Sequence, residues 1–471
     1  PDSERGLRQR LLEDSPLSNT IFLLRSLGSF SLKNVDASDA TQISQSTWQK
    51  TIDAAEKHNL PGVFTTFVGY EWSSMPEDRN LHRNVIYKNI NVPAMPYSSL
   101  ISDDPRDLWA ELDKQRSQGM QVFAIPHNGN VSDGIMYDSV AFDGTKLDAE
   151  YATTRMRNEP ISEIFQVKGS SETHPNNSPN DEFAGFEIYD TMLSQNQGGS
   201  KTEGSYIRDA LRLGLELSHS DSFNPYKFGV IGASDGHNSS APIEEDNFHG
   251  KLPLLDGSPA LRMRTASYFP DTMPGGKRWS AAGLAAVWAK ANTRTALFEA
   301  MERKETYSTS GPRMTVRFFG GWNYPNNLPL QDDWITKAEQ NGVPMGGQLP
   351  QPTATSPSFA VAASKDADSG NLDRIQIIKG WVDSTGQSHE KVFDIVWSGN
   401  RNIDPNTGKL PSVGNTVDKN RATYTNSIGA TQLNTVWVDP EFNANQEAFY
   451  YARVIEIPTP RWTTYDALTL G

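Results

Sequence analysis

The segment FGVIGASDGH, residues 228–237, is the clearest indication of the fold. Its first five residues are apolar or glycine and predict a short buried strand. Ser234, Asp235 and His237 follow closely, so polar side chains stand where the strand ends. In folds built from parallel strands, functional side chains gather at this end of the strands. The segment therefore predicts a parallel α/β arrangement with a functional site beside it.

Other polar residues occupy the same position relative to predicted strands. Between about residues 40 and 310, apolar runs alternate with helical patterns, as expected for an α/β layer fold. The predicted strands are residues 63–70, 82–87, 122–126, 164–167, 185–189 and 228–233, and the predicted helices are residues 46–58, 106–118, 205–217 and 293–304. Glu71, His127 and Lys168 each follow one of these strands, and His82 begins another.

The pattern changes from Arg313 onward, where strands alternate with turns rich in Gly, Pro and Asn. Short apolar runs at residues 314–319, 374–378, 392–397 and 448–457 predict a β-rich, sandwich-like domain. We therefore expect two domains, an α/β domain at residues 1–312 and a β-domain at residues 313–471. Residues 1–40 match neither pattern.

The composition excludes several classes of protein. Against 43 Lys and Arg stand 57 Asp and Glu, a net charge of −14, whereas a nucleic-acid binder needs a basic face. No apolar run approaches the roughly 18 residues of a membrane span, so a soluble protein is expected. The lack of cysteine removes disulfides, cysteine-ligated zinc and cysteine nucleophiles. No signal peptide is visible, and the location stays open between cytoplasm and periplasm or secretion.

Five of the polar residues suit a metal site: Glu71, His82, His127, Asp235 and His237. Their oxygen and nitrogen donors fit a divalent ion such as zinc, manganese or iron. We expect them to converge, because the ends of parallel strands share one mouth. A metal there would lower the pKa of a bound water to about 7 and polarise a phosphoryl oxygen. Each residue alone also has an ordinary interpretation, such as a turn or a structural histidine.

Several long strings resemble a bacterial family, domain-of-unknown-function family 3604. They are GYEWSS (69–74), LHRNVIY (81–87), AIPHNGN (124–130), QVKGSSETHP (166–175), GVIGASDGHNSS (229–240), LAAVWAKANTRTALFEAMERKETYSTSGPR (284–313) and EIPTPRWTTYDAL (456–468). That family is similar to the PHP superfamily, the polymerase and histidinol phosphatase metallo-phosphoesterases. The resemblance implies a distorted (β/α)7 barrel that carries two or three metal ions.

The resemblance also implies a role for each metal-site residue. Glu71 would be the bridging carboxylate, His82 and His127 would be imidazole ligands, and Asp235 with His237 would form a closing Asp-x-His pair. PHP proteins also carry an early His-x-His and an Asp-His motif, yet none of the eight histidines here forms His-x-His. We expect those motifs upstream, with the barrel incomplete at its N-terminus; a degenerate, inactive member is the alternative.

Lys168 and His174 lie in the string that follows the strand at residues 164–167. Lys168 would bind a phosphate, and His174 would act as a general acid or an additional ligand. The alternative is a polar loop in which His174 has a structural hydrogen bond.

Two other classes of function compete with a metal-dependent phosphoesterase. Residues 232–236, Gly-Ala-Ser-Asp-Gly, match the nucleophile elbow of serine hydrolases, with Ser234 as nucleophile. The elbow needs a helix directly after the serine, and the sequence there predicts a loop. A binding module with structural ions is the third class. The preferred prediction is a hydrolase that uses metal-activated water on a small anionic substrate, most simply a phosphate ester.

Overall fold

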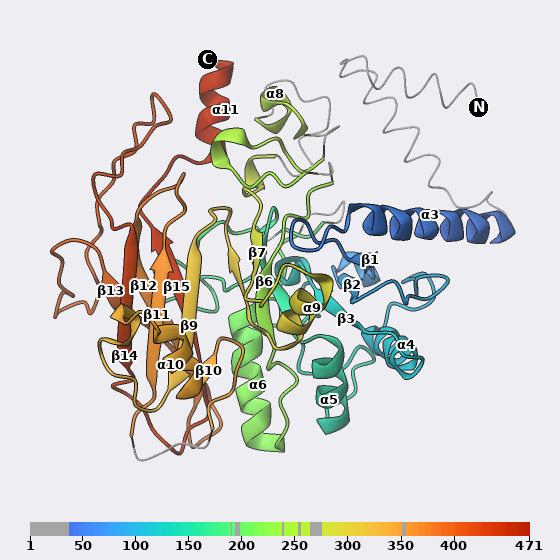
Figure 1. Cartoon of the computed structure of the whole chain (residues 1–471), viewed down its shortest axis with the longest axis horizontal. Coiled ribbons are helices and arrows are strands. Elements are labelled where there is room, and N and C mark those ends of the chain that lie inside the picture. The colour runs from blue at the N-terminus through green and yellow to red at the C-terminus, as the bar shows by residue number, and fades with distance from the viewer. Residues whose placement is uncertain are drawn as a thin grey trace.

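The computed structural model describes residues 37–471 except 190, 194–197, 238–239, 253–255, 264–275 and 351–354, and it leaves the side chains of residues 37–43 undescribed. Figure 1 shows a mixed α/β part that precedes two β-rich layers. The predicted α/β class and the β-rich C-terminal region are both confirmed.

The first sheet consists of β1 (Val68–Trp72), β2 (Arg83–Tyr87) and β3 (Val122–Pro126) in that order. Both neighbouring pairs are antiparallel. Helix α3 (Ala37–His58) and helix α4 (Pro105–Ser117) pack against the sheet, and one hydrophobic cluster joins both helices to it. Asp104 caps α4 by accepting a hydrogen bond from the backbone N–H of Arg106, which agrees with the predicted helix start.

The second sheet contains the parallel pair that the sequence predicts. Strand β4 (Ile161–Gln166) pairs in parallel with β6 (Gly229–Gly232), and the short β5 (Gly169–Ser170) lies on its other edge. Helix α5 (Ala149–Asn158) precedes β4, and α6 (Ile207–Asp221) precedes β6. Strands β7 (Leu284–Val287) and β8 (Thr306–Thr309) form an antiparallel pair beside β6, and the segment that connects them contains α9 (Arg294–Glu302).

The predicted (β/α)7 barrel is not what these residues form: the described part of the chain has separate small sheets, and none closes on itself. Residues 73–82 connect β1 to β2, too few for a crossover helix, so the two strands pair antiparallel instead. The predicted strand at 185–189 is also wrong, because this segment forms turns and Glu187 has a left-handed backbone with φ of 45°.

The C-terminal region has two antiparallel sheets that share a core. One has the order β10-β9-β11-β14 and the other the order β13-β12-β15. Their bounds are β9 (Thr315–Gly321), β10 (Gly342–Pro344), β11 (Ser358–Ser364), β12 (Leu372–Val382), β13 (Ser388–Trp397), β14 (Gln432–Val438) and β15 (Ala448–Glu456). A single hydrophobic cluster includes Phe359 of the first sheet and Ile377 of the second. Short helices complete the chain: α8 (Pro259–Arg262), α10 (Trp334–Gln340) and α11 (Trp462–Leu470).

Helix α6 lies between the two parts of the molecule (Figure 1). Its apolar residues pack against Tyr137 and Phe228, while its polar residues reach the second C-terminal sheet, where Arg212 donates a hydrogen bond to Ser388. Strand β12 is therefore buried on both faces, which its nearly continuous buried pattern reflects. In the described part of the chain, none of the helices combines the length and apolar character that crossing a bilayer requires.

Candidate metal centre

Three of the predicted ligands meet at one end of the first sheet. Glu71 lies near the C-terminal end of β1, His82 directly before β2, and His127 directly after β3. Because β2 runs antiparallel to both neighbours, its start lies beside the ends of β1 and β3. A backbone hydrogen bond from His127 N to His82 O, 3.2 Å, extends the ladder to this point. The sheet itself therefore places the three side chains together.

The ligand atoms of this triad have spacings that suit a metal ion. Nδ1 of His82 lies 2.7 Å and Nε2 of His127 lies 3.8 Å from Oε1 of Glu71. All three residues offer a ligand atom within 4.8 Å of the others. Bonds of about 2.0–2.2 Å in a tetrahedral site put ligand atoms about 3.3 Å apart, which the observed distances bracket. The residues present fit a divalent ion.

Burial and charge keep Glu71 and His127 in the protonation states that metal binding needs. Burial, opposed by the charge of Glu71, lowers the pKa of His127 to about 4, so its imidazole is neutral at pH 7. Burial alone would raise the pKa of Glu71. The hydrogen bond from His82, and the positive charge that His127 carries only below its own pKa of about 4, outweigh that effect and lower the pKa of Glu71 to about 2. Neutral imidazoles and an ionised carboxylate are the ligand forms.

A second group of charged residues surrounds Asp235, which follows β6. The ammonium group of Lys168, which follows β4, forms an ion pair with its carboxylate. Nζ of Lys251 lies 3.3 Å away from the same oxygen, and Gln166 donates a hydrogen bond to it at 3.0 Å. Burial opposes ionisation, but the charges of Lys168 and Lys251 hold the pKa of Asp235 well below its usual range.

The two groups are close enough for their charges to interact. The charge of Asp235 raises the pKa of His127, and that of Glu71 raises the pKa of Lys251, against the stronger effect of burial in each case. Asn128 and Asp235, each within a few residues of a strand end, both have left-handed backbones, with φ of 59° and 51°. Such conformations concentrate at functional sites, and Asn and Asp tolerate them best.

The other predicted residues are placed differently. His237 is about half exposed; its Nδ1 lies 2.9 Å from Nζ of Lys251 and 3.8 Å from Oδ1 of Asp235. His174 lies against Tyr206, with ring centroids 5.6 Å apart, and its Nδ1 accepts a hydrogen bond from Asn176 N. These contacts connect His174 to the segment before α6, and its role as a general acid or an additional ligand stays a prediction.

Ser234 lacks the surroundings of a hydrolase nucleophile. Its hydroxyl accepts a hydrogen bond from the backbone N–H of Gly236, and in the described residues it has no histidine partner. The described residues that follow it, 235–237 and 240–244, are not helical. The nucleophile elbow requires a strand, the serine and then a helix, so the geometry disfavours this alternative.

Two charged residues of this neighbourhood escape the sequence analysis. Lys251 lies in a loop with no recognisable pattern. Glu163 is buried in β4, where Asn128 N donates to it at 3.4 Å, and burial together with the charge of Asp235 raises its pKa to about 8. Glu163 stands directly before the predicted strand at residues 164–167. The observed strand starts three residues earlier, at Ile161, and so includes this glutamate, which the predicted bounds left out.

Comparison with known proteins places the chain in a family. The model of the family described as "Protein of unknown function (DUF3604)" matches residues 19–471. Searches of curated proteins and of solved structures found no match. The match covers nearly the whole chain and includes both the triad and the residues around Asp235. The chain therefore belongs to the DUF3604 family.

Proposed function

We propose that the chain is a metal-dependent hydrolase that acts on phosphate esters. The observation that carries the proposal is the pairing of the Glu71, His82 and His127 triad with a buried Asp235 between two lysines. The triad offers ligands for a divalent cation, and the two lysines beside Asp235 offer ammonium groups for an anion. The resemblance of the motifs to PHP metallo-phosphoesterases supports the same chemistry.

Glu71, His82 and His127 would hold the ion, with Asp235 as a further carboxylate ligand. With Asp235 the ion would have four protein ligands, so an activated water would take a fifth coordination position, which catalytic zinc sites can accept. When bound, a divalent ion would supply an activated water and polarise a phosphoryl oxygen. The carboxylate of Glu71 is ionised and His127 is neutral at pH 7, so neither has to lose a proton first.

The two lysines have separate tasks in this proposal. Lys168 is almost fully buried and offers a fixed positive charge against the anionic substrate. Burial and the charge of Lys168 lower the pKa of Lys251 to about 8, so Lys251 gives up its proton more readily than an ordinary lysine. Lys251 is therefore suited to donate a proton to the leaving oxygen. His237 lies next to Lys251 and is half exposed, so it would pass protons between Lys251 and the solvent.

The test is hydrolysis of an aryl phosphate by the purified chain after treatment with chelator. We expect no turnover until zinc or manganese is added, and about a 100-fold loss in Glu71→Gln, which keeps the side-chain shape but removes the charge. Glu77→Gln is the matched control, because Glu77 is exposed and pairs only with Arg79 among the described residues. Turnover that resists chelation would contradict the proposal. Metal binding without turnover of any ester would favour an inactive binding protein.

A further inference from the structure

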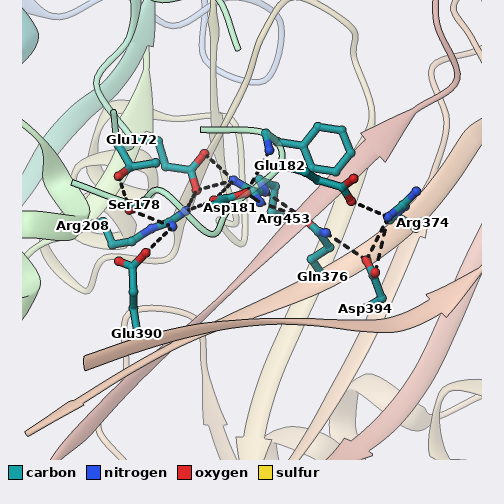
Figure 2. Close-up of polar contacts among 12 residues, drawn as sticks. Glu172, Ser178, Asp181, Glu182, Arg208, Arg374, Gln376, Glu390, Asp394 and Arg453 are labelled. Carbon is teal, nitrogen blue, oxygen red and sulfur yellow. Dashed lines mark hydrogen bonds and ion pairs between the residues drawn. The ribbon is translucent and has the colours of Figure 1, made fainter. Parts of the chain in front are cut away.

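One short segment connects the candidate metal centre to the C-terminal sheets. Glu172 comes four positions after Lys168, and β15 holds its carboxylate (Figure 2). Oε1 of Glu172 accepts hydrogen bonds from Tyr451 at 2.7 Å and from Arg453 at 3.1 Å. Arg208 of α6 donates a third at 2.6 Å. Glu172 belongs to the loop that carries Lys168, and Tyr451 and Arg453 of β15 thus hold it in place.

The contacts around Glu172 are largely buried and share their partners. The side chain of Arg208 is 0% exposed and that of Asp181 is 1% exposed. Arg453 bridges Asp181, at 2.7 Å, to Gln376 of β12, at 2.8 Å (Figure 2). Removing one charge from such a network leaves its partners buried and unpaired, which costs far more than the loss of an exposed pair. The position of Glu172 is therefore strongly determined.

The same segment is fastened at its other end to the metal-centre loop. Asn130, three positions after His127, donates a hydrogen bond to the backbone oxygen of Lys168 at 2.9 Å. Ser171 donates to the side-chain oxygen of Asn130 at 3.0 Å. Residues 168–171 consequently lie between Glu172, which β15 holds, and the loop that carries His127. A shift of Glu172 would move both Lys168 and that loop.

We propose that Tyr451 and Arg453 are positioning residues, through which the C-terminal sheet holds Lys168 and the His127 loop in their working geometry. This inference rests on the proposed metal-dependent function. It assigns the C-terminal region a part in assembling the site rather than a separate activity. Misplacement of a positioned group by about 1 Å is enough to lower activity strongly, so a remote anchor has a measurable effect.

The experiment compares two buried arginines of the same sheet. Arg453→Met removes the anchor of Glu172. Arg374→Met is the matched control, because Arg374 is 2% exposed, pairs with Glu182 at 2.7 Å and with Asp394 at 3.3 Å, and has no described contact with Glu172 (Figure 2). The melting temperature and the zinc dissociation constant are measured for both, the latter by competition with a chromophoric chelator. We expect both variants to melt earlier, but only Arg453→Met to bind zinc about 10-fold more weakly.

A second pair of substitutions, which remove only one hydroxyl each, is used if an arginine variant does not fold. Tyr451→Phe removes the hydroxyl that contacts Glu172, and the expected loss in zinc affinity is about threefold, the effect of one hydrogen bond. Tyr450→Phe is its control, because its hydroxyl donates to Asp439 at 2.7 Å instead. Affinity that is unchanged or tighter in the Tyr451 and Arg453 variants overturns the positioning role and leaves the proposed function intact. Absence of zinc binding in the wild type overturns both.

Discussion

Lys168 and Asp235 form an ion pair across the carboxyl ends of two parallel strands, although 67 residues separate them in the chain. Strand β4 leads to the lysine and β6 leads to the aspartate. The parallel pairing alone places the two side chains at the same edge. Asp235 pairs with Lys168 and Lys251 and is also predicted to bind the metal together with the triad. Its replacement should therefore affect both groups of residues.

The first prediction separates the two classes of hydrolase. Asp235→Ala removes the charged group and should lower aryl phosphate hydrolysis by about 100-fold or more, the upper range for lost ligands and their support. Ser234→Ala should keep most of the activity, because among the described residues its hydroxyl accepts a backbone hydrogen bond from Gly236 and has no histidine partner. Steady-state kinetics measure both. A serine hydrolase would show the opposite pattern and would label at Ser234 with a fluorophosphonate.

The second prediction concerns the ammonium group of Lys251, which as proton donor to the leaving oxygen would also contact a bound phosphate. Lys251→Met keeps much of the side-chain volume and removes the ammonium, so inorganic phosphate should inhibit about 10-fold more weakly, as expected for one charge-assisted hydrogen bond. The inhibition constant is measured from aryl phosphate kinetics at several phosphate concentrations. Lys290→Met, at an exposed position, is the control. Equal inhibition of all three proteins would remove Lys251 from the anion site.

The third prediction is a pH dependence of stability that is remote from the metal centre. Burial raises the pKa of Glu456, in β15, to about 7. The folded pKa exceeds the unfolded one, so the favourable contribution is complete below about pH 4.5 and is lost as the pH rises through about 7. The wild type should therefore lose stability between pH 5 and pH 8, whereas Glu456→Gln should not. The free energy of unfolding of Glu456→Gln, relative to wild type, should increase by on the order of 2 kcal/mol over this range.

Urea unfolding at the two pH values measures this gain. The exposed Glu447→Gln serves as the reference for the loss of one negative charge near the same strand. If the free energies of unfolding of the two variants changed equally with pH, the burial of Glu456 would not be the cause of the pH dependence.

Position along the sequence placed Glu71, His82 and His127 at the boundaries of short apolar strands, where polar side chains reach a sheet edge. It was not sufficient to predict how the strands pair. The residues that follow Trp72 form a loop too short for a crossover, and an antiparallel sheet results where a barrel was expected. His82 stands at the start of its strand, so parallel pairing would put it at the opposite edge from Glu71 and His127. The triad therefore depends on the antiparallel pairing that the sequence did not predict.

The residues that were missed depend on tertiary contacts. Lys251 reaches Asp235 from a loop, and no spacing in the sequence relates the two. Glu172 was read as part of a polar loop, whereas its partners Tyr451 and Arg453 lie about 280 positions away in the chain. Long-range pairs of this kind have no local pattern, and only the tertiary contacts of Tyr451 and Arg453 with Glu172 reveal them.

The most direct test of the metal centre is a crystal of the protein soaked in manganese, with anomalous diffraction recorded. The account predicts a peak about 2.0–2.3 Å from ligand atoms of Glu71, His82 and His127, and its loss in Glu71→Gln. If Asp235 also coordinated the manganese, its ion pair with Lys168 would be weaker in this crystal. A map without a peak between these three side chains, or with the same peak in Glu71→Gln, would contradict the account.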